Sequence, residues 1–166
     1  MTIKEFNQLS AEEAKTEIFK CCGCSSWAIK LTDNRPFNTS DDLRITSDTI
    51  WSTVSETDLM EAFSHHPKIG DKSSLQKKFA TKEWASNEQS GVNNASEEII
   101  DELAKGNADY EKKFGYIFIV CATGKSAKEM LEMLRKRLPN SPEVEIKIAA
   151  REQNKITHLR INKLFS

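Results

Sequence analysis

The residues best suited to do chemistry in this sequence are His65 and His66, which are followed directly by Pro67. Proline disfavours the α conformation in the residue before it, so we expect His66 to close a helix with its imidazole held at a fixed angle. Histidine is the side chain whose ordinary pKa lies nearest physiological pH. The segment therefore predicts an acid or a base on a stiff support, and adjacency to Pro67 favours His66 over His65. A histidine at this position also commonly does no more than end a helix.

Four cysteines, at positions 21, 22, 24 and 121, raise the alternatives of a redox site and a metal site. Cys21 and Cys24 have the Cys-x-x-Cys spacing, but a structural zinc site needs four ligands, usually from two spaced pairs. A redox pair normally begins a helix, whereas this cluster follows a helical pattern. We therefore expect no metal site, and thiols that pack as small apolar side chains.

Three polar residues further along the chain are candidate partners of His66, namely Glu88, Gln89 and Arg160. A carboxylate near a histidine can fix its tautomer or raise its pKa, and an arginine can hold a carboxylate through two parallel hydrogen bonds. Each of the three also fits an ordinary place on a solvated helix face. Their spacing alone does not show that they meet.

The elements that must position these residues are mostly helices, because the sequence is punctuated by helix starts. Capping boxes, in which a Ser side chain and an acidic side chain three residues later cap each other's amides, occur at Ser10, Ser55 and Ser126. Pro142 fits the first position of a helix, and Gly106 and Gly115 fit C-terminal caps. Apolar residues recur at helical spacing in the last third of the chain, at Met130, Leu131, Met133, Leu134, Leu138, Val144, Ile146, Ile148, Ile156, Leu159 and Leu164.

One apolar run, Tyr116–Cys121, has the composition of a buried strand. A lone strand has nothing to pair with in a helical chain, so we expect a buried extended or helical segment through the centre, with a true strand less favoured. If it is extended, its backbone amides and carbonyls are available to a ligand. The stretches 32–47 and 70–89 are expected to be irregular.

Composition narrows the class of protein. The chain has 166 residues with 24 basic and 25 acidic side chains, a net charge of −1, so no concentrated basic face for nucleic acid is expected. No apolar run approaches the roughly 20 residues that span a bilayer, and the N-terminus lacks the pattern of a secretory signal. No repeat or linker divides the chain. We therefore expect one soluble, cytoplasmic domain over residues 1–166, with no membrane partner.

Several short strings occur together and in order in this sequence. They are Cys21-Cys22-Gly23-Cys24-Ser25-Ser26-Trp27-Ala28, Arg35-Pro36-Phe37, His66-Pro67-Lys68-Ile69-Gly70, Trp84-Ala85-Ser86-Asn87-Glu88-Gln89, Lys113-Phe114-Gly115-Tyr116-Ile117-Phe118-Ile119-Val120-Cys121-Ala122, Arg137-Leu138-Pro139-Asn140 and Lys155-Ile156-Thr157-His158-Leu159-Arg160-Ile161-Asn162-Lys163-Leu164. From about residue 5 to the C-terminus, the chain resembles the family of 2-oxo-4-hydroxy-4-carboxy-5-ureidoimidazoline (OHCU) decarboxylases, which form (S)-allantoin in uric acid breakdown.

The resemblance implies an all-α, compact single-domain helix bundle that decarboxylates the small molecule OHCU without a cofactor or metal, and that can form a homodimer. It implies catalytic roles for His66 and Glu88. This chain departs from the family's pattern at one position. Members often carry Ser three residues before the Glu, whereas this chain has Ala85 there and Ser86 one position later. The substrate-binding residues that it implies are Pro67, Ala85, Ser86, Gln89, Phe118, Ile119, Val120, Cys121, Ala122 and Arg160.

Two alternatives remain beside this interpretation. One is a non-catalytic helical interaction module, in which His66 only caps a helix and the cysteine cluster binds a metal or a partner. The other is hydrolysis of 5-hydroxyisourate in the same pathway. That reaction needs an activated water, and the sequence offers no cluster of metal ligands to supply one.

Overall fold

The computed structural model of the protein describes residues 1–68, 70–83 and 90–166, and the side chains in these ranges except those of 80–83 and 90–96. This part of the chain contains nine helices and no strand, so the all-α prediction is confirmed for it. The residues fall into two compact units. Unit 1 comprises Met1–His66 and Ala149–Ser166, and unit 2 comprises Pro67–Ile148. A single domain over residues 1–166 stays a prediction, because it concerns how the two units associate.

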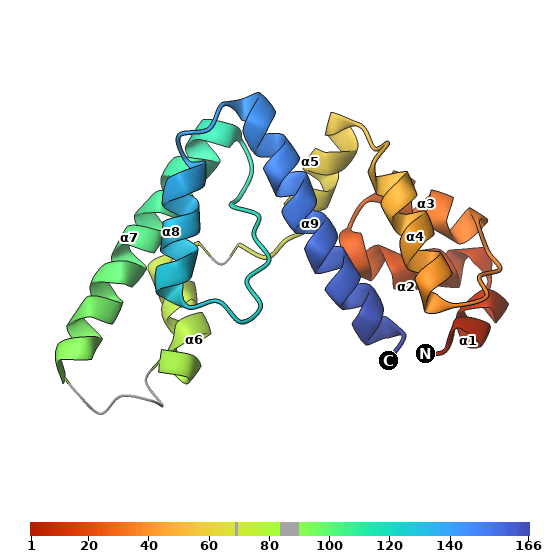
Figure 1. Ribbon diagram of the computed structural model, residues 1–166, viewed down its shortest axis with the longest axis horizontal. Coiled ribbons are helices and arrows are strands. Elements are labelled where there is room, and N and C mark those ends of the chain that lie inside the picture. Colours follow the sequence, from red (N-terminus) through yellow and green to blue (C-terminus); the bar gives the residue numbers. More distant parts are fainter. Residues whose placement is uncertain (69, 84–89) are drawn as a thin grey trace. The chain divides into compact units, whose positions relative to one another are not determined.

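Unit 1 is built from the N-terminal helices and the C-terminal part of the last helix (Figure 1). Its core gathers apolar side chains from all of them, with Trp27, Ile18 and Leu31 fully buried and Ile161 of the last helix among them. The Trp27 indole N–H donates to Ser47 Oγ at 3.2 Å, which satisfies the polar atom of this buried ring. The helices are α1 (Ile3–Gln8), α2 (Ala11–Cys22), α3 (Ser25–Asp33), α4 (Ser40–Trp51), α5 (Glu56–Ser64) and α9 (Pro142–Leu164).

The predicted capping boxes are confirmed at the starts of three helices. Ser10 caps α2, Ser55 caps α5 and Ser126 caps α8 (Ala127–Arg137), each reciprocally with the acidic residue three positions later. Pro142 is the first residue of α9, as predicted. These helix starts are therefore determined by short stretches of sequence, independently of the rest of the fold.

Two stretches predicted to be irregular are instead helical over more than half of their described residues. Half of 32–47, residues 40–47, belongs to α4, whose start is a capping box between Thr39 and Asp42, while residues 34–39 are irregular as predicted. Most of 70–83 belongs to α6 (Lys72–Glu83), in which Leu75 and Phe79, one turn apart, are buried while most of the other described side chains are polar. Both helices bury a narrow apolar stripe, which is a weak signal in the sequence.

Unit 2 contains α6, α7 (Ser90–Phe114), α8 and the first residues of α9. Helices α7 and α8 pack side by side (Figure 1). The prediction that Gly106 ends a helix is wrong, because Gly106 lies inside α7. A Cβ atom there would lie 2.6 Å from Leu134 Cδ2 of α8, so glycine allows the two helices their close approach. Gly115, with φ of +80°, directly follows α7 as predicted for a left-handed cap.

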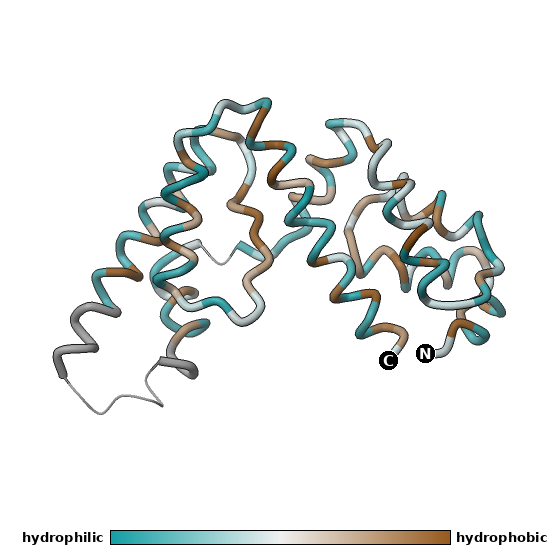
Figure 2. The backbone as a smooth tube through the Cα atoms, in the orientation of Figure 1, coloured by the Kyte–Doolittle hydropathy of each residue, from teal (hydrophilic) through white to brown (hydrophobic). Residues whose placement is uncertain are grey.

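The apolar run from Tyr116 leads from α7 to α8 without regular secondary structure, and Figure 2 shows it as a hydrophobic stretch of backbone. Tyr116, Ile119 and Val120 are buried, as expected. The strand and helix alternatives for residues 116–121 are wrong, and the irregular course leaves these backbone groups without a helix or sheet ladder. Their hydrogen bonds must therefore come from elsewhere.

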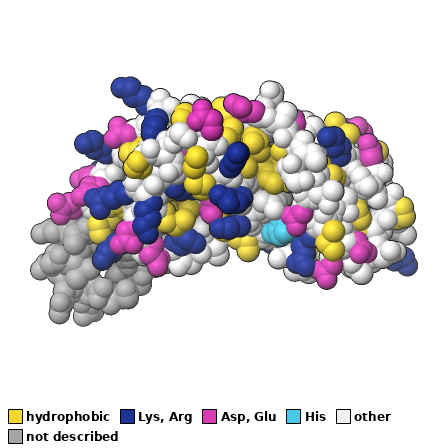
Figure 3. All heavy atoms as spheres, turned by 45° about the horizontal axis from the view of Figure 1, so that its top comes forward, with side chains coloured by type: hydrophobic (Ala, Val, Ile, Leu, Met, Phe, Trp, Pro, Cys, Tyr) yellow, Lys and Arg dark blue, Asp and Glu magenta, His cyan; other side chains and the backbone are white. Residues whose placement is uncertain are grey.

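Acidic and basic side chains are interspersed on the visible face in Figure 3, in keeping with the near-zero net charge. Among the described residues, no helix is both long enough and apolar enough to span a bilayer.

Candidate active site

His66 lies just beyond the end of α5. The helix ends at Ser64 with His65 as its C-cap, and the amide of His66 donates to the Phe63 carbonyl at 3.3 Å. The last residue of the helix thus lies three positions before Pro67, close to where the sequence predicts the end. Because the residue before a proline avoids the α conformation, the chain leaves the helix here with the His66 side chain directed by the turn.

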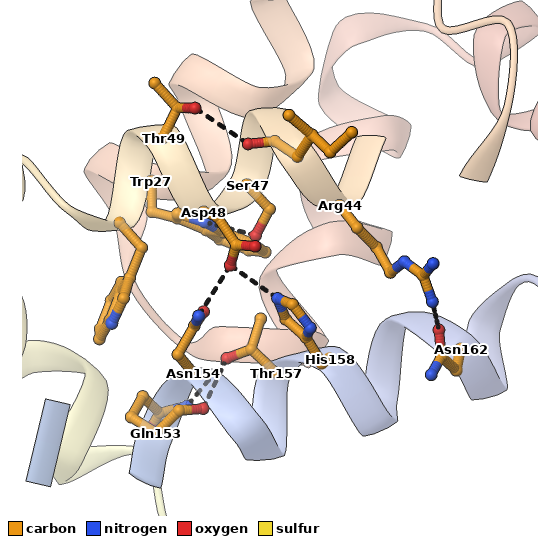
Figure 4. Close-up of polar contacts among 12 residues, drawn as sticks. Trp27, Arg44, Ser47, Asp48, Thr49, Gln153, Asn154, Thr157, His158 and Asn162 are labelled. Atoms are coloured by element: carbon orange, nitrogen blue, oxygen red, sulfur yellow. Dashed lines mark hydrogen bonds and ion pairs between the residues drawn. The ribbon is translucent and has the colours of Figure 1, made fainter. Parts of the chain in front are cut away.

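The imidazole of His66 is hydrogen bonded through Nε2 to the side-chain carbonyl oxygen Oε1 of Gln153 in α9. Gln153 in turn donates from Nε2 to Thr157 Oγ1 at 3.2 Å, and the Thr157 hydroxyl donates to the Gln153 backbone carbonyl at 3.0 Å. Both Gln153 and Thr157 are buried. Figure 4 shows the two side chains together, one turn apart on α9. A series of buried polar contacts thus holds the Nε2 side of the His66 imidazole.

Burial lowers the pKa of His66 below its ordinary value of 6.5. The hydrogen bond to the Gln153 side-chain oxygen opposes this change, because that acceptor favours the charged form of the imidazole, and the positive charge of Arg160 adds to the lowering. His66 is therefore mostly neutral at pH 7. A neutral, half-buried imidazole near an arginine is suited to accept a proton from a bound molecule.

Arg160 lies on α9 one turn beyond Thr157 and is half-buried. Its Nη1 donates to the Cys21 carbonyl at 3.4 Å, which ties the guanidinium to the end of α2. An arginine has five N–H donors, so this one long bond within the described part of the chain leaves others to hold oxygens of a ligand. The structure thus brings two of the predicted site residues, His66 and Arg160, into unit 1 and close enough to interact electrostatically.

The polar face of α9 is the feature that the sequence did not predict. The apolar residues at helical spacing suggest an apolar buried face, yet Val144 and Leu159 are about half exposed, at 50% and 45%. Several of the buried positions of this helix instead carry polar side chains. The buried residues of α9 are instead Glu145, Ala149, Glu152, Gln153, Thr157 and Ile161. Gln153 and Thr157 are four residues apart, and Arg160 follows Thr157 by three, so all three share one face of a helix. This spacing is the sequence signal that could have identified the polar face.

A second polar cluster on α9 faces α4. Asp48 accepts hydrogen bonds from Asn154 Nδ2 and from His158 Nε2, both at 2.7 Å (Figure 4). Arg44 donates to Asn162 nearby at 2.9 Å. These contacts hold α4 against α9 on the flank of the helix away from His66. His158 is therefore a packing residue of unit 1.

His65 has a packing role as well. Its ring meets Phe19 edge to face, with centroids 5.1 Å apart, and its Cβ would lie 2.6 Å from a Cβ added to Gly23. Gly23 is the left-handed C-cap of α2, with φ of +73°. Glycine here serves both the turn and the close approach of the histidine segment. His66 is the member of the pair that reaches Gln153 and Arg160.

The cysteines near this site are unbridged thiols, as predicted. Cys21, Cys22 and Cys24 are buried, and burial raises the pKa of Cys21 to about 11 and of Cys22 to about 12. In the described part of the chain, Cys24 forms a group of potential metal ligands with Asp58 and Glu61. Asp58 is already the capping partner of Ser55, and Glu61 accepts from the Ser25 amide at 2.9 Å. Both carboxylates, Asp58 and Glu61, therefore already accept hydrogen bonds at the starts of helices.

In unit 2, the predicted binding segment is anchored by a buried ion pair. Arg137 donates from Nη1 to the Ile119 carbonyl at 2.7 Å and from Nε to Glu145 at 2.7 Å, and its guanidinium lies 4.6 Å from the Phe118 ring centroid. Tyr110 also donates to Glu145, at 2.6 Å. The Ile119 carbonyl is therefore engaged by the protein, and the course of the segment is fixed by side chains rather than by a sheet.

The other predicted site residues are distributed as follows. Pro67 begins unit 2, in which the segment Phe118–Ala122 also lies. Ala85, Ser86, Glu88 and Gln89 lie outside the described residues, so their predicted roles stay predictions.

Residues 7–162 match the family model described as OHCU decarboxylase. The uric acid degradation bifunctional protein TTL of Arabidopsis thaliana is 39% identical over 160 residues, which cover 95% of this chain and 49% of that protein. The uric acid degradation bifunctional protein of Bacillus sp. (strain TB-90) is 26% identical over 99% of this chain and 32% of that protein. This chain thus spans half or less of the length of these two relatives. The OHCU decarboxylase of Amia calva is 24% identical, over 99% of this chain and 94% of that protein.

Solved structures agree with these matches. A crystal structure of OHCU decarboxylase in the presence of (S)-allantoin has a TM-score of 0.71 and 43% identity, covering 90% of this chain and 96% of that one. A structure of (S)-allantoin synthase has a TM-score of 0.73 at 17% identity, over 99% of this chain and 54% of that one, which shows the common fold. With the family model matching residues 7–162, this chain belongs to the OHCU decarboxylase family.

Proposed function

We propose that this chain decarboxylates OHCU to (S)-allantoin in the breakdown of uric acid. The observation that carries the proposal is a half-buried imidazole of lowered pKa, His66, near Arg160 in a chain that matches the family over residues 7–162. The relative of 43% identity crystallised in the presence of (S)-allantoin supports the same product.

The chemistry of OHCU explains why such a site needs no cofactor. One ring carbon carries both a carboxylate and a hydroxyl, and it lies next to a carbon–nitrogen double bond. When the bond to the carboxylate breaks, its electron pair moves toward this imine, so the ring is its own electron sink. The reaction is then that of a cofactor-independent carboxy-lyase, and the protein contributes orientation and proton transfer.

The site residues take roles in this reaction as the resemblance implies. His66 and Glu88 exchange protons with the substrate hydroxyl and the ring, and delivery of a proton to one face of the adjacent carbon sets the S configuration. Arg160 and Gln89 hold the ureido and ring carbonyl oxygens. Pro67 and backbone groups of 118–122 line the ring. The support from unit 1 is the lowered pKa of His66, which keeps the imidazole ready to accept a proton at pH 7.

The test is to supply OHCU made freshly from urate and to follow its loss by ultraviolet absorption and the appearance of (S)-allantoin by circular dichroism. His66→Asn is expected to lower kcat by about 10²–10⁴, the usual range for a general acid or base. His158→Asn is the matched control, because that histidine pairs with Asp48 away from His66 and a shorter amide keeps its polarity. A folded His66→Asn variant that makes (S)-allantoin at the parent rate would refute the assignment.

The same experiment separates the two alternatives. Loss of 5-hydroxyisourate without decarboxylation would identify the hydrolase. If neither compound is consumed, the result favours a non-catalytic interaction module. Metal content and partner capture would then be measured. A homodimer stays a prediction that light scattering measures directly.

A further inference from the structure

The orientation of the Gln153 side-chain amide is set by Thr157. The Thr157 hydroxyl has one proton, which it donates to the Gln153 backbone carbonyl at 3.0 Å. Toward the amide it can therefore only accept, and it does so from Gln153 Nε2 at 3.2 Å. Gln153 is fully buried and Thr157 is 2% exposed, so water does not compete for these contacts. The carbonyl oxygen of the amide is thereby turned toward His66.

This orientation determines where the imidazole carries its proton. An amide carbonyl oxygen only accepts hydrogen bonds, so the ring nitrogen that faces it, Nε2, must be the donor. A neutral imidazole has a single N–H, so its lone pair then lies on Nδ1. Among the described residues, Nδ1 has no protein hydrogen-bond partner. It is the nitrogen left for a bound molecule.

We propose that Gln153 is a positioning residue, which holds the proton of His66 on Nε2 so that Nδ1 exchanges a proton with the substrate. The second half of this statement rests on the proposed decarboxylation, whereas the tautomer does not. Nδ1 takes the hydroxyl proton as the bond to the carboxylate breaks and CO2 leaves. The electron pair passes into the ring, and the imidazolium returns its proton there, while one proton from water balances the lost carboxylate charge. During this exchange, Gln153 Oε1 accepts from the charged ring.

Among the described residues, few groups act on His66 electrostatically. Arg160 of α9 and the neighbouring His65 both disfavour its charged form, and Cys22 of α2, which lies within reach of Thr157, is neutral because burial raises its pKa to about 12. A negative charge introduced at Gln153 would therefore meet no other acidic group among these and would act on His66 directly.

The first experiment is nitrogen NMR of the parent protein with ¹⁵N-labelled histidine at neutral pH. It needs no substrate, so it decides the tautomer even if the chain does not decarboxylate OHCU. The expected result is a protonated Nε2 and an unprotonated Nδ1 for His66, assigned by its loss in His66→Asn. A proton on Nδ1 would overturn the proposal, because it would require the amide to face the ring with its NH2 group.

The second experiment compares Gln153→Leu and Gln153→Glu in the full chain. Gln153→Leu removes the acceptor at similar size, so the tautomers mix and kcat falls about tenfold or more with KM little changed. Gln153→Glu keeps an acceptor and adds a charge, so kcat largely recovers and the acidic limb of the pH profile of kcat/KM moves to higher pH. Both variants keeping the parent profile in a protein active on OHCU would overturn the role of Nδ1.

Two further variants distinguish a changed tautomer from a misfolded protein. Thr157→Val leaves Gln153 in place but frees its amide to turn over, so the tautomers are expected to mix as in Gln153→Leu. Asn154→Ala is the matched control on the same helix, because its amide bonds to Asp48 and not to the histidine (Figure 4). It is expected to keep the tautomer and the pH profile of the parent. A Thr157→Val protein with the parent tautomer would contradict the mechanism by which Gln153 is oriented.

Discussion

Replacing Glu145 by Ala tests how the binding segment of unit 2 is held. The Glu145 side chain is fully buried and accepts from Tyr110 at 2.6 Å, from Arg137 Nε at 2.7 Å and from Asn140 at 3.0 Å. The nearest Arg137–Glu145 contact is 2.5 Å, and the arginine is itself only 7% exposed. The substitution therefore leaves a buried guanidinium without its counter-charge.

The expected loss of unfolding free energy is about 3–5 kcal/mol, the usual cost of removing one partner of a buried ion pair. Arg137 keeps its bond to the Ile119 carbonyl, so part of its hydrogen bonding survives and the loss should not exceed this range. Such a loss is a large share of the roughly 5–15 kcal/mol that stabilise a typical domain. Urea unfolding followed by circular dichroism measures it, and hydrogen exchange of the α7 and α8 amides locates it in unit 2.

Two controls make this prediction refutable. Glu143→Ala removes an exposed carboxylate two residues earlier in α9 and is expected to change stability by no more than about 0.5 kcal/mol. Replacing the pair together, as Arg137→Met with Glu145→Leu, should recover much of the loss, because no unpaired charge remains buried. If Glu145→Ala costs no more than Glu143→Ala, the ion pair is not what stabilises this part of unit 2.

Three further predictions concern unit 1. Gly23→Ala should cost about 1–2 kcal/mol for its left-handed backbone and more for the contact with His65, whereas Gly124→Ala, at a similar φ with open space around it, should show the backbone cost alone in thermal unfolding. The Cys22 thiol, with its pKa raised to about 12, should react with a disulfide reagent at pH 8 far more slowly in the folded than in the unfolded chain; equal rates would contradict its burial. The pKa of His66 is lower in the folded than in the unfolded chain, so its effect on stability is absent above about pH 6.5 and grows as pH falls toward the folded pKa. The parent should therefore lose more stability than His66→Asn on acidification, and parallel melting curves across this range would show that the pKa is not lowered.

The sequence predicts this fold well where the signal is local. Ser10, Ser55 and Ser126 each specify a helix start with an acidic residue three positions away, and the structure confirms all three. Helix α4 is missed although Thr39 and Asp42 form the same device, because the polar residues after it resemble a loop. Gly106 is misread as a cap for the opposite reason: only the neighbouring Leu134, far away in sequence, shows why glycine stands inside a helix.

The candidate site is predicted less completely, because its support is not local. His66 and Arg160 are found through the resemblance, but Gln153 and Thr157 look like solvated residues of an amphipathic helix. Their burial depends on packing against an N-terminal segment nearly ninety residues away in sequence, which no short pattern encodes. The long apolar run at 116–121 is likewise recognisable as buried, while the Arg137 contact that replaces a sheet partner is not.

The division of unit 1 between the two ends of the chain has a consequence for synthesis. Met1–His66 leaves the ribosome before unit 2, which follows as one continuous stretch that can fold while translation proceeds. His66 must wait for Ala149–Ser166, which brings Gln153 and Arg160, before its imidazole has a partner. The histidine and its support can therefore assemble only after residues 149–166 have been translated, and a chain that terminates before them carries the imidazole without Gln153 and Arg160.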